Sequence, residues 1–324
     1  MRRSAVLLGL PLLMLAAGCA PAGSEPTAAP TDLVGRPSAD HRSEAFHQRA
    51  TEVAEAWRPG PAWSGGYVPL EGPTLLTGDP GFTPDTETAF RAGWYRDQIA
   101  LPGERPADGA IRFPDGTLTV PLVSAAEAYR QLDQGDTPVC EGRPQVPPLP
   151  KDGPTIEPGP DGWATSAPQS TCTPLTVTAV RLGTAPVLTS RGEAQVPAWL
   201  FTVDELRSPV ARLAVAAEAV GAVPEPTAPS RPAPTGFVGA QDIESVDGVR
   251  LTYRLGVGAC DTEVTPLVQE HDGAVVVGGL VTTSVDLCTE QLKLEPVTVT
   301  LKAPLGARPV LDVLTGAPLR IAPR

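Results

Sequence analysis

Proline and glycine set the strongest limit on what this chain can fold into. The 324 residues include 39 prolines and 32 glycines. Proline removes a backbone hydrogen-bond donor from a helix, and glycine loses more backbone entropy there than any other residue. A mostly helical protein is therefore excluded, and a chain of short strands and turns is expected.

Short apolar runs separated by turn residues make up most of the sequence. Residues 175–182 alternate between apolar and polar side chains, and Asp247-Gly248 and Asp272-Gly273 each separate two apolar-rich runs. An Asp-Gly pair favours a hairpin because glycine tolerates positive φ. We predict an α+β, mainly β fold in two bodies, with antiparallel sheets as a sandwich or open barrel and a few short helices. The other expected strands are 118–123, 187–189, 194–203, 242–246, 249–257, 264–270, 274–283, 297–302 and 310–314.

Three segments predict helices. In residues 40–58, apolar side chains recur at helical spacing from Phe46 to Trp57, and Pro59 follows. In residues 124–133, Ser124 and Glu127 have the spacing of a capping box. A third, shorter helix is expected near 85–93.

The first nineteen residues look like an export signal. Arg2 and Arg3 precede an apolar segment, 5–17, that is too short to span a bilayer as a helix. The segment ends Leu-Ala-Ala-Gly-Cys, which resembles the bacterial lipobox. That resemblance implies removal of residues 1–18, attachment of a diacylglyceryl group with two acyl chains such as palmitate to the sulfur of Cys19, and anchoring on the extracytoplasmic face of the cell membrane. Two acyl chains give stable anchoring where one does not.

Composition shifts divide the remaining chain. Residues 20–39 consist mostly of small residues and proline, and residues 224–235 read PEPTAPSRPAPT. Both compositions are typical of extended, flexible segments. The predicted order is a signal peptide 1–18, a tether 19–39, an α+β body 40–223 with a proline-rich excursion 141–171, a linker 224–235 and a small β body 236–324.

The cysteines agree with export. Four remain after Cys19: Cys140, Cys172, Cys260 and Cys288. An even number in an exported protein predicts disulfides, and three connectivities are open. The pairing Cys140–Cys172 with Cys260–Cys288 is favoured because each pair falls within one segment. The alternative, a cysteine metal site, is disfavoured by wide spacing and by the lack of any C-x-x-C motif, so no metal is predicted.

The motifs of catalysis and cofactor binding are missing from the sequence. The three histidines, His41, His47 and His271, form no H-E-x-x-H motif, and no G-x-S-x-G or S-x-x-K occurs. Asp261 and Glu263 are expected to share one face of a strand, more as a solvated face than as a carboxylate pair. We predict no catalytic residue, no cofactor and no enzymatic activity.

Two further features bear on partners. Lys and Arg number 25 against 37 Asp and Glu, which disfavours nucleic acid because phosphate binding needs a concentrated positive face. The aromatic segment 63–67, Trp-Ser-Gly-Gly-Tyr, allows either a binding groove or core packing, and core packing is favoured in a chain with few aromatic residues.

Two longer segments carry a family resemblance. CTPLTVTAVRLGTAPVLTSRGEAQVPAWLFTV (172–203) and VTVTLKAPLGARPVLDVLTGAPL (297–319) resemble stretches of uncharacterised secreted lipoproteins of actinobacteria. The resemblance implies an extracytoplasmic compartment and paired cysteines; the family has no assigned activity, so no site residue follows from it. The functional prediction is a lipid-anchored, non-enzymatic binding or interaction module of the cell envelope, whose partner is an envelope protein or a polysaccharide. The alternatives are a solute-binding lipoprotein of a transporter and an envelope hydrolase whose site uses His271.

Overall fold

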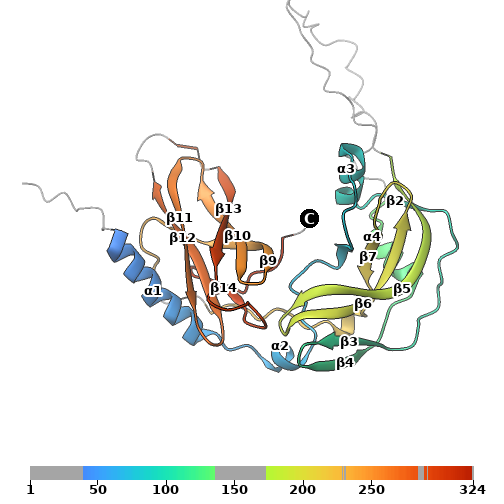
Figure 1. The fold of residues 1–324 in the computed structure, drawn as a ribbon, viewed down its shortest axis with the longest axis horizontal. Coiled ribbons are helices and arrows are strands. Elements are labelled where there is room, and N and C mark those ends of the chain that lie inside the picture. The colour runs from blue at the N-terminus through green and yellow to red at the C-terminus, as the bar shows by residue number, and fades with distance from the viewer. Residues whose placement is uncertain are drawn as a thin grey trace, which may run out of the picture. The chain divides into compact units, whose positions relative to one another are not determined.

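The fold is mainly β, as predicted. The computed structural model describes residues 39–135, 173–227, 229, 231–283, 288–289 and 291–322. These ranges form three sheets and four α-helices (Figure 1). The helices are α1 (Ala39–Ala56), α2 (Pro61–Gly65), α3 (Pro84–Ala92) and α4 (Ala125–Leu132), with a 3-10 turn at Ala217–Ala219.

The largest sheet has seven strands. Its main order is β1-β7-β6-β3-β4, and β5 pairs with β6 and with β2. The long hairpin of β5 and β6 forms the curved ribbon in Figure 1, and it turns at Ser190 and Arg191. The strands are β1 (Thr74–Leu76), β2 (Tyr95–Asp97), β3 (Gly109–Phe113), β4 (Gly116–Val120), β5 (Leu175–Thr189), β6 (Gly192–Val203) and β7 (Val210–Leu213).

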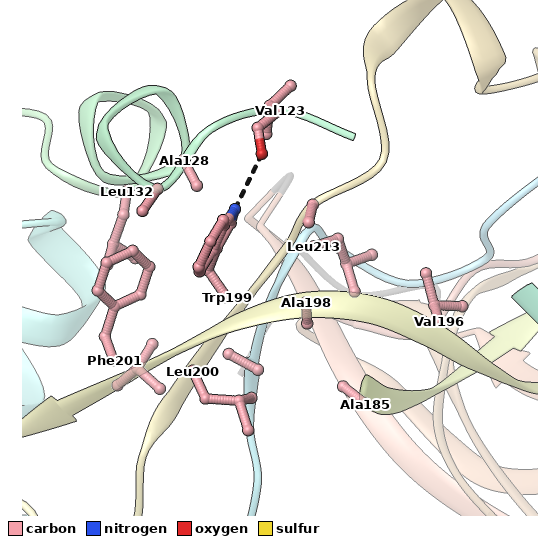
Figure 2. Close-up of a cluster of buried hydrophobic side chains, with 14 of the residues drawn as sticks. Val123, Ala128, Leu132, Ala185, Val196, Ala198, Trp199, Leu200, Phe201 and Leu213 are labelled. Carbon is pink, nitrogen blue, oxygen red and sulfur yellow. Dashed lines mark hydrogen bonds between the residues drawn. The ribbon is translucent and has the colours of Figure 1, made fainter. Parts of the chain in front are cut away.

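Strand β6 provides the centre of this sheet's core. Trp199 and Phe201 are buried, as the alternation along the strand predicts, and Leu200 between them is buried as well. Figure 2 shows Trp199 beneath α4, where its indole Nε1 donates a hydrogen bond of 2.9 Å to the Val123 carbonyl. The sheet therefore has apolar contacts on both faces at β6, and the polar atom of its largest side chain is satisfied.

The remaining strands form two smaller sheets. One has the order β13-β10-β9, and the other has the order β11-β12-β14 with β8 also paired to β12. Tyr253 of β10 lies in their shared core, and its hydroxyl lies within hydrogen-bonding distance of the Leu267 and Gly278 carbonyls. The strands are β8 (Phe237–Val238), β9 (Ala240–Asp247), β10 (Arg250–Gly258), β11 (Asp261–Glu270), β12 (Val275–Thr283), β13 (Leu292–Thr300) and β14 (Val310–Asp312).

Between the strands that the structure describes, pairing is antiparallel except at two places. Strand β2 runs parallel to β5, and β14 runs parallel to β12. Parallel neighbours need a long connection instead of a hairpin. The chain between β12 and β14 supplies one by passing through β13, so the sheets are mixed where the sequence predicts antiparallel pairing alone.

The three predicted helices are confirmed. Helix α1 packs Phe46 and Val53 against the sheet that contains β12. Helix α4 begins at Ser124, whose Oγ accepts the Glu127 N–H at 3.2 Å, although the Glu127 carboxylate turns to Arg130 instead of closing a capping box. None of the helices in the described ranges is long and apolar enough to cross a membrane.

The disulfide prediction is confirmed for one pair. Cys260 and Cys288 are bonded, with their Cα atoms 6.0 Å apart. Cys19, Cys140 and Cys172 lie outside the described residues, as do the tether up to Ser38 and the excursion 141–171. Residues 39–324 form one compact unit by their contacts. The division of the chain into two bodies at 224–235 stays a prediction.

Candidate binding site

One cavity in the compact unit has the size of a ligand site. Its volume is about 510 Å³, within the range of roughly 300–1,000 Å³ that is typical of small-molecule sites. Its walls come from the loop before β1, from β1 itself, from the β5–β6 hairpin and β9, and from the loop 304–306 and residues 321–322 near the C-terminus. We call this the acidic cavity, because three glutamates are among the residues that line it.

Backbone hydrogen bonds hold the walls of the acidic cavity in place. Leu70 lies at the centre of these bonds: its N–H donates to the Leu188 carbonyl at 2.8 Å, and its carbonyl accepts from Ile321 N–H at 2.7 Å. Ala322 N–H in turn donates to the Ile243 carbonyl of β9 at 2.8 Å. Because these segments are far apart in sequence and bonded through their backbones, the cavity is formed before any ligand arrives.

All the charged side chains that line the acidic cavity among the described residues are negative. Glu71, Glu193 and Glu244 line it, and no Lys, Arg or His is among the described residues that do so. Glu71 Oε1 accepts the Leu188 N–H at 2.8 Å, which fixes that carboxylate to the wall. Glu193 and Glu244 are exposed and form no ion pair within the described residues. A concave surface lined by one sign of charge concentrates ions of the opposite sign.

Apolar side chains supply the rest of the contact surface. Leu75, Leu76 and Phe90 line the cavity from β1 and α3, and Leu188 and Leu305 line it from β5 and the loop after β13. Leu305 is buried, and the others are half-buried. Apolar walls with a few fixed polar groups are typical of sites that bind small organic molecules.

A buried tyrosine lies next to one of the carboxylates. Tyr67 is 1% exposed, and its hydroxyl is buried with no hydrogen-bond partner in the described part of the chain. Burial raises the pKa of Tyr67, and the nearby Glu71 carboxylate raises it further. Tyr67 is therefore neutral at physiological pH and adds no charge near the cavity.

Trp63, the other aromatic residue of segment 63–67, agrees with the core interpretation. Trp63 is 5% exposed, and its ring meets the Trp57 ring edge to face at 5.2 Å between centroids. The two aromatic side chains of the segment, Trp63 and Tyr67, therefore pack the interior, while Ser64 and Gly65 between them are exposed.

Asp261 and Glu263 do not share a strand face as the alternation predicts. A β-bulge between Thr262 and Thr265 breaks the register of β11, and Glu263 has a φ of 53°. Asp261 accepts the Gly258 N–H at 2.7 Å, whereas Glu263 accepts the Thr282 hydroxyl at 2.7 Å. An extra residue in one strand reorients every side chain at the bulge, so each carboxylate has a separate structural partner.

The histidines are distributed among unrelated positions. His271 lies in the turn between β11 and β12, where its N–H donates to the Ala274 carbonyl at 2.8 Å; its Nε2 is buried without a partner among the described residues. His47 Nδ1 lies 3.0 Å from Gln269 Oε1. No histidine lines the acidic cavity within the described ranges, so Ser245, which does line it, has no imidazole base there.

The carboxylates that line the acidic cavity were not predicted from the sequence. Glu71, Glu193 and Glu244 lie far apart in sequence, and none belongs to a motif. Each is an ordinary exposed or half-exposed charge until the fold assembles the walls, so pattern alone contains no signal for them. The chain matches no protein-family model, no curated protein and no solved structure.

Proposed function

We propose that the chain is a lipid-anchored protein of the extracytoplasmic face of the cell membrane, and that it binds a small organic molecule in the acidic cavity without transforming it. The acidic cavity is the observation that carries the binding half of the proposal. It joins apolar walls to three carboxylates, and no Lys, Arg or His is among the described residues that line it. These features favour a ligand that has an apolar body and is positively charged or neutral, and they disfavour an anion.

The lipobox supports the anchored half of the proposal. Cys19 follows a positive segment and a short apolar segment in the arrangement of a lipoprotein signal. Cells that express the full-length chain should incorporate a clickable palmitate analogue into it, and Cys19→Ala should abolish the label. Equal labelling of the Cys19→Ala chain would contradict anchoring at this residue.

A ligand series of equal length and different charge tests the binding half. We propose thermal unfolding of the chain from residue 20 with 1,6-diaminohexane, 1,6-hexanediol and adipate. A ligand at a hundred times its dissociation constant stabilises a fold by about 2.7 kcal/mol, which is a shift of several degrees. The diamine should give the largest shift and adipate none. Equal shifts from all three compounds, or the largest from adipate, would contradict the proposed site.

A further inference from the structure

Among the described residues no strand pairs with the outer side of β13, here called its free edge, although just past the end of β13 the Lys302 N–H donates to the Glu270 carboxylate of β11 at 2.7 Å. Strand β13 ends the sheet order β13-β10-β9, and in the part of the chain that the structure describes it is paired only with β10. A strand at the edge of a sheet leaves a row of backbone N–H and C=O groups available to another strand. The side chains and charges along this edge limit which strand can pair with it.

The pairing pattern shows which backbone groups point outward. Leu301 N–H donates to the Val249 carbonyl at 2.7 Å, in the register that pairs β13 with β10. Bonded and non-bonded pairs alternate in an antiparallel ladder. The odd-numbered residues of β13 therefore bond to β10, and the even-numbered residues, among them Leu292 and Leu294, direct their backbone groups to the free edge. Pro296 is one of these, so its missing N–H costs no bond to β10 but leaves the free edge one donor short at this residue.

The same stretch exposes its apolar side chains. Leu292 is 62% exposed, the most of any large apolar side chain among the described residues, and Leu294 is 42% exposed, as is Leu182. They lie opposite Gly258 and Gly256 of β10, which have no side chains to cover them. Apolar side chains of this size are buried in most folds or at interfaces.

We propose that β13 pairs with β13 of a second copy of this chain, antiparallel, about a two-fold axis at Leu294. In this register Leu294 opposes its own copy, and Leu292 opposes the partner subunit's Pro296. Lys293 opposes the partner subunit's Glu295, and the symmetry makes the same pair twice. A two-fold interface must be self-complementary, and the sequence Leu-Lys-Leu-Glu-Pro satisfies this condition.

The charges select this register. Moving the two-fold axis by one residue places Lys293 opposite its own copy or Glu295 opposite its own copy, and like charges directly opposite are destabilising. The same two charges disfavour pairing with strands that lack the complementary pattern. The edge is therefore selective for a second copy of this chain.

Crosslinking of the full-length chain in cells tests the geometry. Bonded antiparallel partners have Cα atoms about 5.5 Å apart, which suits a disulfide. Leu294→Cys should give a covalent dimer on a non-reducing gel under mild oxidation. Leu292→Cys is the matched control, because four residues of offset separate the two cysteines by roughly 13 Å. A Leu294→Cys dimer no more abundant than the Leu292→Cys dimer would overturn the proposal.

Charge reversal in the Leu294→Cys chain tests the register. Lys293→Glu alone and Glu295→Lys alone each create two like-charge pairs and should lower the crosslinked fraction by about fivefold. Co-expression of the two variants with different tags should restore crosslinking between them, because the unlike chains are complementary. Restored crosslinking also shows that both variants fold. The proposal would be overturned if either single variant gave the same crosslinked fraction as the Leu294→Cys chain, or if co-expression of the two variants did not restore that fraction.

Discussion

At the scale of single residues, Arg49 shows how one buried charge joins distant segments. It is 7% exposed on helix α1, and its guanidinium donates to the carbonyls of Val313 at 2.8 Å, Leu314 at 3.0 Å and Arg231 at 2.6 Å. Hydrogen bonds to charged groups are stronger than neutral ones, and buried carbonyls without a donor are destabilising. Arg49 therefore fixes α1 to the chain that follows β14.

We predict that Arg49→Ala lowers the free energy of unfolding by about 3 kcal/mol, because it leaves three carbonyls without their donor. Arg49→Lys should recover only part of this loss, since an ammonium lacks the planar arrangement of donors. Urea unfolding followed by tryptophan fluorescence measures both. Arg58→Ala, at an exposed position just beyond α1, is the control and should change stability little. Equal stability of Arg49→Ala and wild type would contradict the assigned role.

Glu205 gives a prediction about pH. Burial raises its pKa, but hydrogen bonds from the backbone N–H and the hydroxyl of Thr176, both 2.7 Å, outweigh burial and lower it below the ordinary value. A carboxyl with a lowered pKa in the folded state contributes stability that is complete above the unfolded pKa of about 4.3, and that is lost as pH falls through the lower folded value.

Glu205→Gln should therefore be less stable than wild type at pH 7, and the difference should shrink on acidification to about pH 3. Unfolding by urea at several pH values measures this. Glu104→Gln, at an exposed carboxylate, controls for the loss of one charge. A difference between Glu205→Gln and wild type that stays constant with pH would contradict the prediction.

At the scale of elements, local pattern predicted most helices and strands. The stripe from Phe46 to Trp57 locates α1, and Asp247-Gly248 locates the turn between β9 and β10, where Gly248 has a φ of 59°. These signals are local, because each depends on neighbouring residues alone. Strands such as β3 and β7 were missed, because each is only four or five residues long and so shows little alternation of its own.

The bulge in β11 and the parallel pairings were not predictable for a different reason. Whether β14 meets β12 or another strand depends on packing between residues far apart in sequence. The acidic cavity is beyond local pattern for the same reason, since its carboxylates meet only after the sheets have formed. Local pattern therefore predicts the fold class and most of the elements, whereas packing between distant segments determines the site.

A substitution at Gly279 of β12 tests how closely β12 packs against β10. A Cβ at this position would lie 2.5 Å from Leu255 Cδ1 and 3.2 Å from the Thr265 carbonyl oxygen, so the neighbouring strands approach this residue closely. Gly279→Ala should lower the free energy of unfolding by about 1–3 kcal/mol through overpacking. Gly273→Ala adds the same methyl group where no atom lies within 4 Å and serves as the control. A fully stable Gly279→Ala chain would show that the two strands are farther apart.

In the molecule as a whole, a predicted lipoprotein signal is combined with a candidate ligand-binding cavity. The lipobox predicts a membrane surface, and the acidic cavity supports binding of a cationic or neutral organic molecule. The net charge of −12 acts in the same direction, because an acidic protein attracts cations over a distance that salt limits to about 10 Å. Pairing through β13 would place two acidic cavities in one assembly, so binding and self-association are measured separately.

The most direct test of the central claim is calorimetric titration of 1,6-diaminohexane into three forms of the chain from residue 20. These are wild type, Glu193→Gln/Glu244→Gln in the acidic cavity, and Glu55→Gln/Glu104→Gln at exposed positions outside it. The two double variants lose the same charge. We predict that the cavity variant binds about tenfold more weakly than wild type and that the control binds within twofold of wild type. Equal binding by both double variants would contradict the acidic cavity as the binding site.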